Sequence, residues 1–69
     1  MKVFEMKGID GTATAFRARD VQQLVWSALP EGHTVRVFFG SNSWVEEFFG
    51  TADEAAEMYQ AIYQAMEAE

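Results

Sequence analysis

The charged side chains in the second half of this sequence are all carboxylates. Seven of them follow Arg36, after which the chain has no lysine or arginine: Glu46, Glu47, Asp53, Glu54, Glu57, Glu67 and Glu69. Residues 1–36 carry five basic and four acidic side chains, so the net charge of −6 comes from the second half. A surface of one sign steers association toward partners of the opposite sign. These residues therefore predict ionic contact with a basic surface rather than a reaction.

Residue types that serve catalysis or metal binding are too few here to predict an enzyme. The chain has no cysteine and one histidine, His33, which falls in a predicted turn beside Gly32 with no second ligand. It also lacks a glycine-rich phosphate loop, a serine nucleophile motif and a calcium loop. A chain of 69 residues is too short to promise a cleft between two lobes. We therefore predict no enzymatic activity, no cofactor and no metal.

Two β-hairpins are predicted from short β-prone runs separated by turn residues. Strands are expected at 2–7 and 12–18, joined through Asp10-Gly11, because both of these turn positions tolerate positive φ. Further strands are expected at about 34–39 and 44–49, around a turn rich in glycine and serine.

Each hairpin is followed by a predicted helix. Residues 21–29 have apolar side chains at helical spacing, with a capping box of Asp20 and Gln23 before them and Pro30 after them. A second helix of about four turns is expected to begin at a capping box of Thr51 and Glu54. Its apolar residues at helical spacing are expected to face the core: Ala52, Ala55, Met58, Tyr59, Ile62, Ala65 and Met66. The chain would thus be a single α+β domain, residues 1–69, made of two hairpin-plus-helix units at 1–30 and 33–69. The order β-β-α-β-β-α predicts a four-stranded antiparallel sheet packed by two helices.

Several aromatic side chains fall at positions outside the core that this fold predicts. Trp26 lies off the apolar stripe of the first predicted helix, so it either covers the rim of the domain or anchors a partner. If Phe39 pairs with Trp44, Arg36 lies opposite Glu47, which gives it an ion-pair partner. That register also leaves Phe38, Val45 and Phe49 on the sheet face away from the core. Either the helices divide between the two faces or a partner buries the second face. The aromatic candidates for a partner or dimer contact are Trp26, Phe38, Trp44 and Phe49.

The acidic residues differ in how well local structure explains them. Asp53 and Glu54 fall in the first turn of the second helix, where the helix dipole favours negative charge. Glu46 and Glu47 fall in a strand, where glutamate is a poor choice. The helix face opposite the core is either a solvated acidic surface or a binding surface. The acidic candidates for partner contact are Glu46, Glu47, Asp53, Glu57 and Glu67.

These features favour a non-enzymatic binding protein that occupies a basic, nucleic-acid-binding surface of a partner protein. Small acidic inhibitors carried by phages, including some anti-CRISPR and anti-restriction proteins, work in this way and offer a functional analogy. The alternative is a homodimeric structural or accessory protein that buries an aromatic sheet face, with the acidic surface serving solubility alone. Single-stranded nucleic-acid binding by the basic residues of the first half is a third, weaker hypothesis.

The expected location is the cytoplasm, or the host cytoplasm if a phage encodes the chain. The first residues contain no apolar stretch of signal-peptide length, and no apolar run approaches the length of a membrane span. Anionic lipid and bare nucleic acid would repel a chain with this charge. No membrane or direct nucleic-acid partner is therefore expected.

Overall fold

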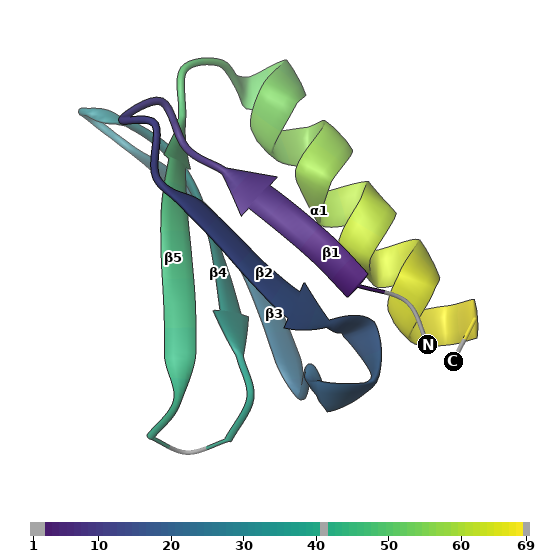
Figure 1. The fold of residues 1–69 in the computed structure, drawn as a ribbon. Coiled ribbons are helices and arrows are strands. Elements are labelled where there is room, and N and C mark those ends of the chain that lie inside the picture. Colours follow the sequence, from purple (N-terminus) through teal and green to yellow (C-terminus); the bar gives the residue numbers. More distant parts are fainter. Residues whose placement is uncertain (1–2, 41, 69) are drawn as a thin grey trace.

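The computed structural model describes residues 3–40 and 42–68, which form two antiparallel sheets, a short 3-10 helix and one α-helix (Figure 1). In chain order the elements are β1 (Val3–Lys7), β2 (Ala13–Arg17), the 3-10 helix η1 (Ala18–Asp20), β3 (Gln23–Leu29), β4 (Gly32–Phe38), β5 (Trp44–Phe49) and α1 (Ala52–Ala68). β1 pairs with β2, and the second sheet has the strand order β3-β4-β5. The predicted four-stranded sheet packed by two helices is wrong, because the described chain has five strands in two sheets and one helix.

The segment predicted as the first helix is strand β3. Its apolar residues also fit a strand, because Leu24, Trp26 and Ala28 alternate with the residues that face the other side. Pro30 and Glu31 form a two-residue hairpin loop, since Leu29 pairs directly with Gly32 at its ends. Proline therefore begins a turn here instead of ending a helix.

The capping box predicted before that helix is also absent. Asp20 ends η1, and its carboxylate accepts a hydrogen bond of 2.8 Å from Nε of Arg17. Gln22 already pairs with the sheet, since its backbone N–H donates to the Phe38 carbonyl at 2.8 Å.

The first hairpin forms as predicted around Asp10 and Gly11. β1 and β2 pair from Val3↔Arg17 to Lys7↔Ala13, and residue 2 of the predicted strand lies outside the described residues. Gly11 adopts a φ of +87°, a conformation that glycine takes without strain. The Thr12 backbone N–H donates to the Asp10 carboxylate at 2.9 Å and thereby lowers the pKa of that carboxyl group. This contact supports the turn above the ordinary pKa of aspartate and is lost as pH falls through the lowered value.

Helix α1 begins at the predicted capping box. The Glu54 backbone N–H donates to Oγ1 of Thr51 at 3.1 Å, and the Thr51 hydroxyl donates to Oε1 of Glu54 at 3.2 Å. The side of α1 predicted to face the core includes its buried residues Ala55, Ile62 and Ala65. Both features were predictable because they depend only on local spacing.

Replacing the capping threonine tests this helix start. Thr51→Ala is expected to lower the free energy of unfolding by about 1 kcal/mol, because the Glu54 N–H loses its side-chain acceptor. Urea unfolding measures the change. Gln60→Ala, at an exposed position on α1, is the matched control and should stay within about 0.5 kcal/mol of the unaltered chain. Equal effects of the two substitutions would contradict the capping role.

The register of β4 and β5 differs by one residue from the predicted one. Phe38 rather than Phe39 pairs with Trp44, so Arg36 lies opposite Glu46 and Val35 lies opposite Glu47. Phe39 leaves the ladder after its N–H donates to the Ser43 carbonyl at 2.8 Å, and its ring packs against Phe16 at 5.6 Å. A slip of one residue moves side chains to the other face of a strand.

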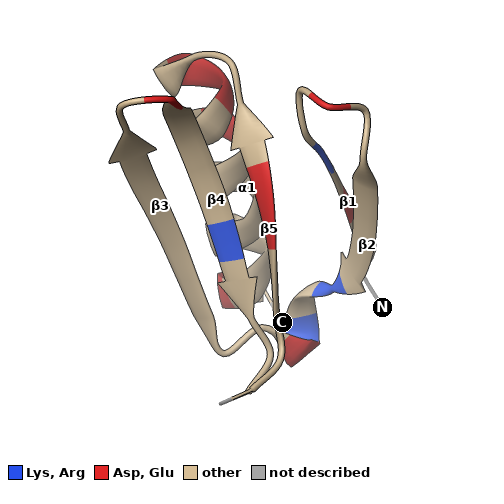
Figure 2. Cartoon of the chain, turned by 90° about the vertical axis from the view of Figure 1, so that its left-hand side faces the viewer, with Lys and Arg blue, Asp and Glu red and all other residues tan. Residues whose placement is uncertain are grey.

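The core lies between the inner face of the β3-β4-β5 sheet, the β1–β2 hairpin and α1. Buried apolar residues from all of these parts form it: Met6, Phe16, Val35, Val37, Phe49, Ala55 and Ile62. In Figure 2, α1 lies behind the three-stranded sheet and the β1–β2 hairpin stands beside it. In the described part of the chain, no helix combines the length and the apolar character that crossing a bilayer requires.

Candidate functional site

One face of the three-stranded sheet is covered by neither α1 nor the β1–β2 hairpin. We call it the outer face. The strand register places these side chains on it: Gln23, Val25, Ser27, Leu29, Thr34, Arg36, Phe38, Trp44, Glu46 and Phe48. They alternate along each strand with the residues that pack toward the core. The outer face is the side turned toward the viewer in Figure 2.

Half of the outer-face side chains are apolar, and the largest of them are open to solvent. Trp44 is 49% exposed, and Leu29 and Phe48 are each 39% exposed. The rings of Phe38 and Trp44 lie 6.2 Å apart, in contact across the two strands. Thr34, between these residues on the central strand, is buried at 1% exposure, so its larger neighbours close over it. This face therefore carries three exposed large apolar side chains around a closely packed centre.

A single ion pair balances the charge of the outer face. Nη2 of Arg36 lies 2.6 Å from Oε2 of Glu46, and Nε of Arg36 donates to the same oxygen at 3.1 Å. The guanidinium carbon also lies 4.8 Å from the centre of the Trp44 ring, a cation–π distance. Glu46 is therefore already paired within the chain. Arg36 does form a cross-strand ion pair, as the sequence predicts, but its partner is Glu46 rather than Glu47.

Two of the predicted contact residues lie inside the protein. Phe49 is 7% exposed and belongs to the core, so its predicted position on the open face is wrong, as is that of Val45. Glu47 is 4% exposed, and its Oε2 accepts a hydrogen bond of 3.1 Å from Oγ1 of Thr14. Gly8 lies against the same carboxylate, where a Cβ atom would collide with Oε1. Glu47 thus joins the β1–β2 hairpin to the sheet instead of facing solvent.

The other acidic candidates lie on α1. Asp53, Glu57 and Glu67 are exposed, and no lysine or arginine occurs anywhere in this helix. α1 packs on the inner face of the sheet, so these acids and the outer face lie on opposite sides of the molecule. The structure does not bring Glu46 and Glu47 together with Glu57.

Trp26 lies in strand β3 rather than in the predicted helix. It is 42% exposed on the inner face of β3, where its ring lies 6.2 Å from Tyr59 and 6.5 Å from His33. His33 is in β4 rather than in a turn, is half-buried, and has a buried Nδ1 without a hydrogen-bond partner. Within the described ranges, no three His, Asp or Glu side chains are close enough to share a metal ion.

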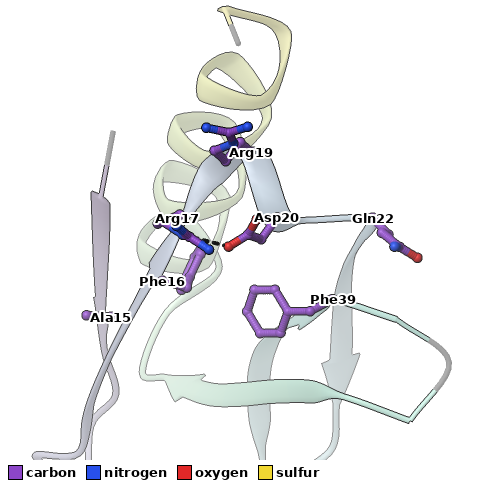
Figure 3. A pocket seen from close by; sticks show the side chains of 7 residues that line it. All are labelled: Ala15, Phe16, Arg17, Arg19, Asp20, Gln22 and Phe39. Atoms are coloured by element: carbon purple, nitrogen blue, oxygen red, sulfur yellow. Dashed lines mark hydrogen bonds and ion pairs between the residues drawn. The ribbon is translucent and has the colours of Figure 1, made fainter. Parts of the chain in front are cut away.

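A shallow depression of about 650 Å³ lies where η1 meets the sheets (Figure 3). Seven residues line it: Ala15, Phe16, Arg17, Arg19, Asp20, Gln22 and Phe39. Arg17 pairs with Asp20 at its rim at 2.8 Å, and Phe39 presents its ring to the opening. Its lining combines the Arg17–Asp20 ion pair, the guanidinium of Arg19, the amide of Gln22 and the rings of Phe16 and Phe39.

Sequence reasoning missed Leu29 and Phe48, both on the outer face. The signal that could have found Leu29 is the two-residue spacing between Leu29 and Gly32, which fits a hairpin loop as well as a helix end. Phe48 was missed because its face depends on the β4–β5 register, which the loop fixes.

Comparison of the chain with protein-family models, with curated proteins and with solved structures finds no significant match.

Proposed function

We propose that this chain is a small non-enzymatic binding protein that forms a homodimer through the outer face, in a structural or accessory role. The observation that supports this most is the open apolar face, where Leu29, Trp44 and Phe48 remain exposed together. The three side chains lie on one face of the sheet, and exposed apolar side chains that gather on one face of a soluble protein mark an interaction site.

A second copy of the chain suits this face because of its charge. The chain carries a net charge of −6, so two copies repel one another over most of their surface. The outer face is neutral, since Arg36 and Glu46 compensate each other there. Two such faces can pack as a sandwich, with the sheets about 10 Å apart and the rings interdigitated. The acidic side chains elsewhere then keep the dimer soluble.

Tryptophan emission tests this proposal directly. In Trp26→Phe, Trp44 is the one tryptophan that remains. We expect its emission to shift to longer wavelength on dilution, because the ring leaves the dimer interface for water. Emission that is independent of protein concentration and already typical of a hydrated ring would contradict a dimer at this face. Trp44→Phe, which reports on Trp26 alone, is the matched control and should not shift on dilution.

The exposed face of α1 favours a second function, the binding of a partner with a basic surface in the manner of an inhibitor or decoy. Asp53, Glu57 and Glu67 point to solvent with no cation on the helix to pair with them. Glu46 and Glu47 contribute little to this surface, since one is paired and the other is buried.

Salt dependence tests the second function, with poly-lysine as the probe. Binding is expected to weaken steeply as salt rises, because exposed charge pairs are screened. Removing three charges from α1 by Asp53→Asn, Glu57→Gln and Glu67→Gln should weaken binding at low salt. Removing three charges outside α1, by Glu5→Gln, Asp10→Asn and Asp20→Asn, is the matched control and should have a smaller effect. Equal losses in both variants would show that net charge rather than α1 is responsible.

A further inference from the structure

β3 forms an open edge of the three-stranded sheet. It pairs with β4 on one side, and no strand of the described chain lies beyond it on the other (Figure 2). The opposite edge is different, because the Ile9 backbone N–H donates to the Phe48 carbonyl of β5 at 2.9 Å. The β1–β2 hairpin therefore covers part of the β5 edge, while the β3 edge stays uncovered.

The residues of β3 do nothing to protect that edge. Its seven residues include no lysine, arginine, aspartate, glutamate or proline. Natural proteins usually place charges, prolines or bulges on a free edge, because unpaired N–H and C=O groups are a template for another strand. A long uncharged edge is therefore suited to strand addition.

The hairpin loop fixes which backbone groups face outward. Leu29 and Gly32 flank a two-residue loop, so they form a hydrogen-bonded pair, and such pairs recur at every second residue. The N–H and C=O groups of Leu24, Trp26 and Ala28 consequently point away from β4. These three residues supply the backbone groups that an added strand would meet.

An aromatic row begins at this edge and continues along α1. Trp26 lies 6.2 Å from Tyr59, and Tyr59 lies 6.3 Å from Tyr63, which is 45% exposed. A strand added to β3 would direct every second side chain toward this row, on the inner side of the sheet. The row offers apolar contact and π faces to those side chains.

The charge beside the row selects the partner. Glu67 follows Tyr63 by four residues, so both lie on the same side of α1. Glu31 is exposed in the loop at the end of β3. No cation occurs in β3, in this loop or in α1. Lysine and arginine from a partner would meet acids at both places and could lie on the tryptophan and tyrosine faces.

We infer that the β3 edge is a strand-addition site for an extended segment of a partner protein that contains lysine or arginine. The choice of a basic partner rests on the second function proposed above, whereas the mode of binding rests on the edge itself. The site is separate from the outer face, so a homodimer through that face leaves it open.

A short peptide probe tests the inference. The probe is a capped eight-residue peptide of alternating lysine and valine, and its controls are the glutamate–valine peptide and a backbone N-methylated lysine–valine peptide. In Trp44→Phe, the fluorescence of Trp26 reports binding at the edge. Hydrogen exchange then compares the amides of Leu24, Trp26 and Ala28 with those of Val25, Ser27 and Leu29 in the same strand.

We expect the lysine–valine peptide to bind and to slow exchange of the outward amides at least about tenfold, while the inward amides change little. The glutamate and N-methylated peptides should bind far more weakly. Ala28→Pro should weaken binding because it removes one outward N–H. If that variant does not fold, the N-methylated peptide still tests strand pairing on the unaltered chain.

Three results would overturn the inference. In each of them, the poly-lysine experiment still tests independently whether the chain binds a basic partner. Equal binding of the N-methylated peptide would show ionic contact without strand addition, and the basic partner would stand. Binding of poly-lysine without binding of the peptide would also remove the edge site alone. Outward amides that are already protected in the free protein, in a dimer, would show that a second copy occupies the edge.

Discussion

Replacing Trp44 and Phe48 together by threonine is expected to raise the dissociation constant of the dimer at least about a hundredfold. Large aromatic side chains at the centre of an interface typically contribute about 2 kcal/mol or more each, and a loss of about 2.7 kcal/mol is a factor of a hundred. Threonine keeps a high strand propensity, so the fold itself should be preserved. Both side chains are exposed in the monomer, so replacing them does not also remove packing energy from the core.

A matched substitution separates the outer face from general surface hydrophobicity. Val3 is 63% exposed at the start of β1, in the hairpin that packs on the core side of the sheet. Val3→Thr is therefore expected to leave the dissociation constant unchanged within about twofold. Light scattering over a concentration series measures both. A dimer that persists in Trp44→Thr/Phe48→Thr and weakens in Val3→Thr would place the interface elsewhere.

Thr14→Val is expected to lower the free energy of unfolding by about 1–3 kcal/mol, although valine and threonine are nearly the same size. The hydroxyl of Thr14 donates to the carboxylate of Glu47, which is 4% exposed. Removing the donor leaves a buried acceptor without its partner, and this is the costly way to lose a hydrogen bond. In a domain of 69 residues, such a loss is a large part of the total stability.

The double substitution Thr14→Val/Glu47→Leu should recover most of that loss. Both partners are then apolar, so no unpaired polar group remains between the β1–β2 hairpin and the sheet. Urea unfolding of the two single variants and the double variant gives the coupling between the residues. Strictly additive effects would mean that the Thr14–Glu47 contact does not hold the two sheets together.

The sequence predicts the helix and the first hairpin because their signals are local. Residues 51–68 combine a capping box with apolar side chains at helical spacing, and Asp10-Gly11 marks a turn. Residues 21–29 carry an apolar pattern that suits either a helix or a buried strand, and periodicity alone cannot separate the two. Pairing with β4, a tertiary contact, decides in favour of the strand.

The candidate site was less predictable because it depends on register. Phe38 falls on the outer face as predicted, but Phe49 and Val45 do not, since Phe39 leaves the ladder to pack on Phe16. The same shift exchanges the partners of Arg36, from Glu47 to Glu46. Nothing in the spacing of the two glutamates indicates which one is buried, because the β1–β2 hairpin that covers Glu47 lies far from it in the sequence.

Sedimentation equilibrium of the unaltered chain decides whether the outer face forms a dimer. The chain has a mass of 7.8 kDa, and we expect twice that mass at concentrations of about 100 µM, with a monomer appearing on dilution. High salt should leave the dimer intact or strengthen it, because the outer face is neutral and salt screens the repulsion between two acidic chains. A mass of 7.8 kDa at every concentration and salt level would rule out the dimer.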